Sequence, residues 1–238
     1  MLGIIHNLLS EPAIAEQHFI QALNFNPASD AAWSQLGSTQ YTLGKYEPAA
    51  ASLNKSISIN PKNTQSLNNL GNLHRELGNL ADAERCYRKS IKVNRKDPIA
   101  LNNLANIYLA QCIYDKAERY YKEAIKHNRL YFDAHYNLGA TYHAKAELKL
   151  ALHFYKRAQK INPTNPLPLT AIANLYEKKG EIDKSLEYLA PLLSSQTVSP
   201  DAAETFGKIC ISRKQYDEGI EIIKRCLSNR LNPISEQQ

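Results

Sequence analysis

A period of 34 residues runs along the chain and constrains its fold more than any other feature. Residues 67–74 read LNNLGNLH, and residues 101–108 read LNNLANIY. Seven small residues recur at this spacing, each after a large apolar one: Gly3, Gly37, Gly71, Ala105, Gly139, Ala173 and Gly207. A second series of small residues follows twelve positions later, from Ala15 to Gly219. A fixed period of this length without insertions is typical of stacked repeat arrays.

Each repeat carries two helical faces. Leu67, Leu70 and Leu73 share one face of a helix, and Ala83 and Tyr87 lie on another. The small residues let two antiparallel helices approach closely, and the large ones fill the gaps between them. The spacing predicts helices over about positions 2–14 and 18–30 of every repeat. Gly44, Gly78 and Gly180 mark predicted turns between paired helices, where glycine tolerates a positive φ. Because one pair cannot bury its apolar face alone, neighbouring pairs must stack.

The pattern resembles the tetratricopeptide repeat family. The family's signature is visible as Trp33-x2-Leu36-Gly37 and again as Leu138-Gly139-x2-Tyr142, and its closing Asn-Pro stands at Asn26-Pro27, Asn60-Pro61 and Asn162-Pro163. The resemblance covers nearly the whole chain. It implies an all-α fold, a right-handed superhelical solenoid of antiparallel helix pairs.

The period also predicts the domain organisation. We expect a single array over residues 1–233, with a tail over 234–238. Its repeats are a truncated one at 1–29 and full ones at 30–63, 64–97, 98–131, 132–165, 166–199 and 200–233. Pro191 falls inside a second helix, where it removes a backbone donor, so we expect that helix to be shortened or kinked.

The charge and the cysteine content of the chain argue against a nucleic-acid-binding protein and against a metal-binding protein. The formal charge of +6 is mild for 238 residues, so nucleic acid is an unlikely partner. The four cysteines form no Cys-x-x-Cys pair, which argues against a metal site and favours a reducing compartment. No signal peptide and no membrane span is evident. We therefore expect a cytoplasmic protein without metal or cofactor.

The resemblance implies which residues face a ligand, because in this family the first helix of each repeat lines the concave surface. Asparagines recur there, as in the asparagine ladder of the O-linked N-acetylglucosamine transferase family. They are Asn68, Asn69, Asn72, Asn102, Asn103, Asn106, Asn137 and Asn174. An asparagine row offers donors and acceptors to an extended peptide backbone. The alternative is that some of these amides only join neighbouring helices.

Four further side chains belong to the same candidate surface: Tyr41, Arg75, Tyr136 and His143. Tyr41 and Tyr136 are expected to be exposed anchors, whereas Tyr142 and Tyr176 are expected in the core. We also expect Asn69, Asn103 and Asn137 to face solvent, so that replacing them would leave the fold intact.

These features favour a non-catalytic scaffold that binds a protein or peptide in its concave groove. The histidines, serines and acids form no recognisable triad, and Gly44-Lys45 is not a phosphate-binding loop. Two alternatives stay open. One is a substrate-recruiting arm of a larger glycosyltransferase or sulfotransferase, and the other is a weak RNA-binding array, because Lys and Arg recur along the second helices.

The last helix carries an apolar face. Ile222 and Ile223 lie in it without a visible cap. Exposed apolar patches on soluble proteins usually mark contacts. We expect either end-to-end self-association or a native chain that continues beyond Gln238.

Overall fold

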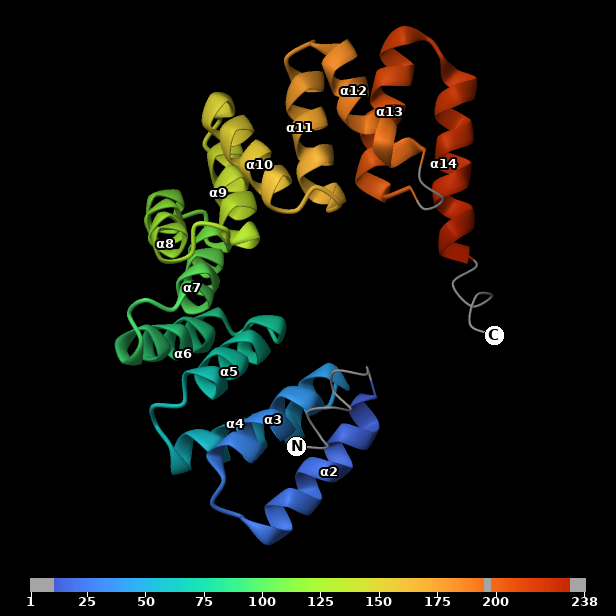
Figure 1. Cartoon of the computed structure of the whole chain (residues 1–238). Coiled ribbons are helices and arrows are strands. Elements are labelled where there is room, and N and C mark those ends of the chain that lie inside the picture. The colour runs from blue at the N-terminus through green and yellow to red at the C-terminus, as the bar shows by residue number, and fades with distance from the viewer. Residues whose placement is uncertain (1–10, 195–197, 232–238) are drawn as a thin grey trace. The chain divides into compact units, whose positions relative to one another are not determined.

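The computed structural model describes residues 11–194 and 198–231, with side chains as far as Arg225. Every regular element in these ranges is an α-helix (Figure 1). The chain divides into two compact units, residues 1–129 and 130–238, and each is described here by itself. The fold is all-α, as the period predicts.

Over residues 11–129, three antiparallel helix pairs follow one second helix. These elements are α2 (Pro12–Phe25), α3 (Asp30–Thr42), α4 (Tyr46–Ile59), α5 (Thr64–Glu76), α6 (Leu80–Val93), α7 (Pro98–Ala110) and α8 (Tyr114–His127). Unit 2 contains three pairs: α9 (Phe132–Ala144), α10 (Leu148–Ile161), α11 (Pro166–Lys178), α12 (Ile182–Leu193), α13 (Pro200–Arg213) and α14 (Tyr216–Leu231). Each helix begins one residue before the position that the period predicts.

The helix α12 is shortened, which confirms the expectation for Pro191. It has 12 residues, whereas α4, α6, α8 and α10 have 14. Pro191 lies inside its last turn. Because proline lacks an amide hydrogen and its ring crowds the preceding turn, the helix does not reach the usual length.

Polar side chains set where several first helices begin. The Ser29 hydroxyl accepts a hydrogen bond from the Ala32 amide, and the Asn63 side chain accepts one from the Ser66 amide. Asp97 and Ser199 cap α7 and α13 in the same way. Each cap satisfies an amide that has no partner within its helix.

The turn inside each pair uses a positive φ. Gly44, Gly78 and Gly180 have φ angles of 72°, 77° and 75°. They confirm the predicted turns, since glycine adopts this conformation without steric cost. At the same place in other repeats Cys112, Ala146 and Lys214 have φ angles of 58° to 60°. The repeat geometry therefore imposes the turn even where no glycine is present.

Small and large residues interlock between the two helices of a pair. A Cβ atom at Gly71 would lie 2.5 Å from Cε1 of Tyr87, and one at Gly139 would lie 2.6 Å from Cδ1 of Tyr155. Tyr87 is fully buried, and Tyr155 is 3% exposed. The recurring small residue thus sets how closely the paired helices approach.

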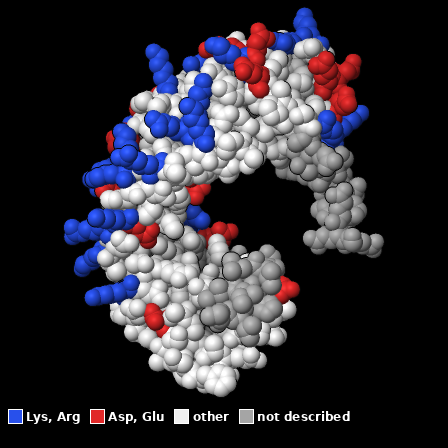
Figure 2. Space-filling view, viewed as in Figure 1, with Lys and Arg blue, Asp and Glu red and all other residues white. Residues whose placement is uncertain are grey.

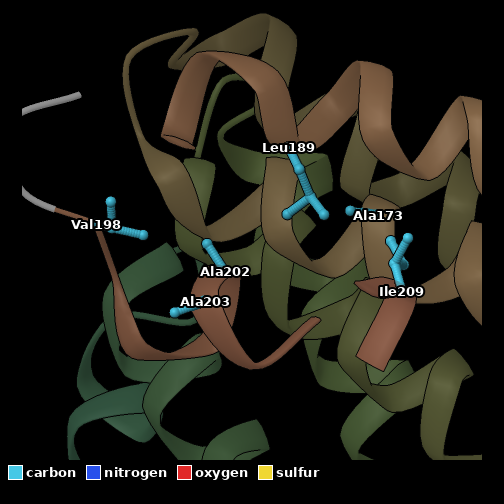
Figure 3. Packing of buried hydrophobic residues seen from close by; sticks show 6 residues of the cluster. All are labelled: Ala173, Leu189, Val198, Ala202, Ala203 and Ile209. Atoms are coloured by element: carbon cyan, nitrogen blue, oxygen red, sulfur yellow. The ribbon is translucent and has the colours of Figure 1, made fainter. Parts of the chain in front are cut away.

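In unit 2, three helices meet over an apolar cluster. Figure 3 shows Ala173 of α11, Leu189 of α12 and Ile209 of α13 side by side, with Val198, Ala202 and Ala203 completing the cluster. Ile222 of α14 packs against this cluster and is half-buried, whereas Ile223 is 42% exposed. The expectation of an exposed apolar pair on α14 is therefore wrong for Ile222.

Candidate functional site

The first helices of unit 1 form a continuous surface because α3 contacts α5 and α5 contacts α7. We call this the first-helix surface of unit 1. Eight of the candidate binding residues lie on its helices: Tyr41, Asn68, Asn69, Asn72, Arg75, Asn102, Asn103 and Asn106. Their environments differ, and these differences decide which of them are accessible to a ligand.

Asn72 is the centre of a hydrogen-bond network. The Tyr87 hydroxyl donates to Asn72 Oδ1 over 2.7 Å, and Asn103 Nδ2 donates to the same oxygen over 3.3 Å. The network joins α5 to α6 in its own repeat and to α7 in the next. Because Oδ1 accepts both bonds, the amide of Asn72 is held in one orientation.

Asn106 repeats this contact one period later. The Tyr121 hydroxyl donates to Asn106 Oδ1 over 2.5 Å. Tyr87 and Tyr121 are both fully buried, and burial raises the pKa of each phenol above its usual range. The neutral hydroxyl is therefore kept, and it is the form that donates to the amide oxygen.

Three asparagines are buried and do not face solvent. Asn68, Asn102 and Asn103 are 8%, 3% and 9% exposed. Asn68 Nδ2 donates to Asp97 Oδ2 over 3.0 Å, so it fastens α5 to the residue that caps α7. The expectation that Asn103 faces solvent is wrong, because its amide is buried and bonded to Asn72. For Asn68 and Asn103, the alternative of contacts between helices applies.

The accessible part of the surface centres on Asn69, Tyr41 and Arg75, which are all half-buried. The Asn69 amide makes no hydrogen bond within the described residues, so its donors and acceptor are available. Tyr41 packs against Tyr46 with ring centroids 5.9 Å apart. Burial raises the pKa of Tyr41, the charge of Glu76 raises it further, and the charge of Arg75 lowers it.

In unit 2, Tyr136 and Asn137 lie on α9 and are half-buried. The Tyr136 ring stacks on Phe132 at 6.3 Å and tilts against Tyr155 at 5.5 Å. Burial raises the pKa of Tyr136, and the negative charge of Asp201 adds to this. Tyr136 is thus a partly covered aromatic anchor, not a fully exposed one.

His143 and Asn174 also have partners within unit 2. His143 Nε2 lies 3.1 Å from the ammonium nitrogen of Lys178, and burial together with this lysine lowers the pKa of the imidazole. Asn174 Oδ1 accepts a hydrogen bond of 2.6 Å from the Thr205 hydroxyl. Asn174 therefore links α11 to α13, as Asn72 links α5 to α7. Tyr142 and Tyr176 are buried, as expected.

Sequence reasoning missed the tyrosines that fix the asparagines. Asn72 and Tyr87 are 15 residues apart, and so are Asn106 and Tyr121. This spacing recurs with the period and was therefore available as a signal. It joins a first helix to the second helix of the same repeat, which marks these asparagines as partly structural.

The described residues show neither a metal site nor a membrane-spanning helix. They contain no group of three His, Cys, Asp or Glu side chains placed to hold a metal ion. None of their helices is long and apolar enough to cross a membrane.

Comparisons with known proteins identify the repeats. A family model described as the tetratricopeptide repeat matches residues 64–97, 98–129 and 132–165, and a second model with this description matches residues 30–63. The search of curated proteins found no significant match.

Solved structures show similar folds at low sequence identity. MamA matches with 24% identity and a TM-score of 0.59, over 74% of this chain and 96% of its own. PilW, described as a type IV pilus biogenesis factor, matches with 20% identity and a TM-score of 0.78, over 86% of this chain and 95% of its own. YrrB, described as a protein with an unusual peptide-binding site, matches with 16% identity and a TM-score of 0.57, over 79% of this chain and 91% of its own.

Proposed function

Because the chain belongs to the tetratricopeptide repeat family, we propose that it is a non-catalytic scaffold whose first-helix surface binds a peptide segment of a partner protein. The family supports a role in protein interaction in general. What we propose beyond this general role is that the ligand is a peptide and that it binds to the first helices.

The main observation in support of peptide binding is the fixed orientation of the Asn72 amide. Two donors occupy its Oδ1, so its Nδ2 is left to donate to a ligand. Because the amide is already fixed, a peptide carbonyl that binds there costs little additional side-chain entropy. Asn69, one turn away on α5, adds a donor and an acceptor that have no partner within the described residues.

The neighbouring side chains suit a peptide better than a small molecule. The Asn69 amide can pair with both the N–H and the C=O of a peptide backbone, and Asn72 Nδ2 can donate to a second carbonyl, whatever the side chains of the peptide. Tyr41 adds an amphipathic ring, and Arg75 adds a charge that selects acidic groups on the peptide. The peptide-binding site named for YrrB, a structure of similar fold, supports the same use of the fold.

The experiment starts from peptides selected on the full chain from a random display library. The test variant replaces Asn69 and Arg75 with alanine. Neither side chain bonds to another described residue, so folding is expected to be unchanged. Loss of hydrogen bonds to the peptide should weaken binding about tenfold or more.

The matched control is Asn54→Ala, which removes an exposed asparagine from the second helix α4. It should leave the Kd unchanged. The proposal is overturned if the selected peptides bind the double variant with the wild-type Kd, or if Asn54→Ala weakens them equally.

A further inference from the structure

A cluster of cations and tyrosines occurs twice, 68 residues apart. In unit 1, Arg88 Nη2 donates to the Tyr108 hydroxyl over 2.7 Å. The Tyr108 ring stacks on Tyr120 with centroids 5.6 Å apart, and the Lys116 ammonium lies 5.2 Å from the Tyr108 centroid. We call these residues the Tyr108 cluster.

Unit 2 repeats the arrangement position by position. Lys156 Nζ donates to the Tyr176 hydroxyl over 3.3 Å. The Tyr176 ring stacks on Tyr188 at 5.7 Å, and the Lys184 ammonium lies 5.6 Å from the Tyr176 centroid. Lys179 lies 6.0 Å from the same ring. We call these residues the Tyr176 cluster.

The Tyr108 cluster holds a carboxylate of its own. The Tyr108 hydroxyl donates to Glu84 Oε1 over 2.9 Å, and Arg88 Nη2 forms an ion pair with the same oxygen at 2.8 Å. Glu84 therefore shows what this arrangement of cation and phenol binds. A carboxylate accepts a hydrogen bond from the phenol and is neutralised by the cation beside it.

The Tyr176 cluster lacks this carboxylate. The position of Glu84 is occupied 68 residues later by Leu152. Glu181 pairs with Lys184 of the cluster over 2.5 Å and not with Lys156. Lys156 makes no ion pair with a described residue, and its ammonium lies 5.8 Å from the Tyr176 centroid and 5.7 Å from the Tyr188 centroid.

The surroundings of Lys156 are basic. The helix α10 carries four Lys or Arg residues and no Asp or Glu. A surface groove of about 480 Å³ runs along it, and its lining among the described residues consists of His153, Lys156, Arg157 and Lys160. Figure 2 shows Lys and Arg side chains gathered over α10 in unit 2 and over α6 and α8 in unit 1. Such a surface attracts an acidic chain before contact is made.

We propose that the Tyr176 cluster is a binding site for a carboxylate side chain of an acidic protein segment, which takes the place that Glu84 occupies in the Tyr108 cluster. The segment lies along α10, where Arg157 and Lys160 meet further acidic residues. Its carboxylate accepts hydrogen bonds from Lys156 and from the Tyr176 hydroxyl. This site is separate from the first-helix surface and does not depend on the proposed function.

The rings of the cluster favour a protein segment over a nucleic acid. Single-stranded nucleic acids need exposed aromatic faces on which bases stack. Tyr176 is only 8% exposed, and its faces are covered by Tyr188 and by lysine side chains. The cluster therefore offers a charge and a hydroxyl, but no platform for a base.

The test introduces a carboxylate of the chain itself into the Tyr176 cluster, where it should compete with the ligand. Leu152→Glu supplies the carboxylate that Glu84 supplies in unit 1, and the half-buried position lets the fold accept it. The probe is a fluorescein-labelled peptide of alternating glutamate and serine, and anisotropy gives its affinity for the full chain. We expect Leu152→Glu to weaken binding at least tenfold, the scale of one lost charge-assisted hydrogen bond.

The matched control is Leu150→Glu, which makes the same change of charge at an exposed position of the same helix. This variant should weaken binding of the probe by no more than about threefold, because it changes only the long-range electrostatic attraction and not the contacts of the cluster. Equal losses for the two variants, or no binding by the wild-type chain at low salt, would overturn the proposal. So would an RNA oligonucleotide that binds more tightly than the peptide and is equally sensitive to Leu152→Glu.

A reciprocal variant gives a second readout. Glu84→Leu empties the Tyr108 cluster, so the number of bound probe molecules should rise from one to two, as calorimetry measures it. A stoichiometry that stays at one in a folded variant contradicts the assignment of Glu84 as the occupant of an equivalent site.

Discussion

Alkaline pH should unfold this protein through its buried tyrosines. Tyr87, Tyr121 and Tyr155 are 0%, 0% and 3% exposed, and burial raises the pKa of each above its usual range. Tyr87 and Tyr121 also donate to amide oxygens, and ionisation would replace each donor with an anion facing that oxygen. The native state therefore requires all three phenols to be neutral.

The sign of the effect follows from proton linkage. An unfolded tyrosine loses its proton near pH 10, whereas the native residue keeps it to higher pH. Above pH 10 the unfolded state binds fewer protons, so the free energy of unfolding falls as pH rises. The slope approaches about 1.4 kcal/mol per pH unit for each tyrosine, or about 4 kcal/mol for the three. The stabilising contribution is fully present below pH 10.

Urea unfolding followed by far-UV circular dichroism measures this slope between about pH 10 and 11.5. Tyr121→Phe should lower stability at neutral pH by about 1 kcal/mol, because it removes the bond to Asn106. Above pH 10 the same variant should reduce the slope by about 1.4 kcal/mol per pH unit.

Tyr216→Phe is the control, since Tyr216 is 55% exposed. It should leave the slope unchanged. A slope that is the same in wild type and Tyr121→Phe would refute the reasoning, because it would mean that the buried phenol ionises as readily as an unfolded one.

Two further predictions test the packing. Gly71→Ala should lower the free energy of unfolding by about 1 kcal/mol in urea titrations, because a Cβ 2.5 Å from the anchored Tyr87 ring costs more than the gain in helix propensity; an equally or more stable variant would contradict this. Leu189→Ala should cost about 2–5 kcal/mol. Hydrogen exchange should accelerate in α11, α12 and α13 but not in α5 and α6, since repeats contact only their neighbours, and equal acceleration everywhere would count against the repeat picture.

The sequence alone determined the helices and the core. A side chain's place on a helix depends only on its spacing from its neighbours, so the 34-residue period was enough to predict the helix pairs and the turns at Gly44 and Gly78. It also predicted the burial of Tyr142 and Tyr176 and the shortening of α12 by Pro191. The helices, the turns and the shortening of α12 follow from local geometry, and the buried positions follow because every repeat stacks on its neighbours in the same way.

The tertiary structure decided which of the asparagines are accessible. Asn69 and Asn103 stand at the same position of successive repeats, yet Asn69 is half-buried without a hydrogen bond to any described residue, whereas Asn103 is bonded to Asn72. The period places both on the same helical face. It does not say which amide meets a partner on the neighbouring helix, because that depends on rotamers and on the separation of the helices.

For the Tyr176 cluster too, the sequence supplies the residues and the tertiary structure decides which of them are in contact. Lys156, Tyr176, Tyr188 and Lys184 of this cluster come from three helices, and only their packing brings a lysine within hydrogen-bond distance of a buried phenol. The sequence does contain the substitution of Glu84 by Leu152 one double period later. The sequence does not show why this difference matters, because the contacts of Glu84 with Arg88 and Tyr108 are visible only in the structure. Whether a charged side chain binds a neighbour depends on the distance and direction between them.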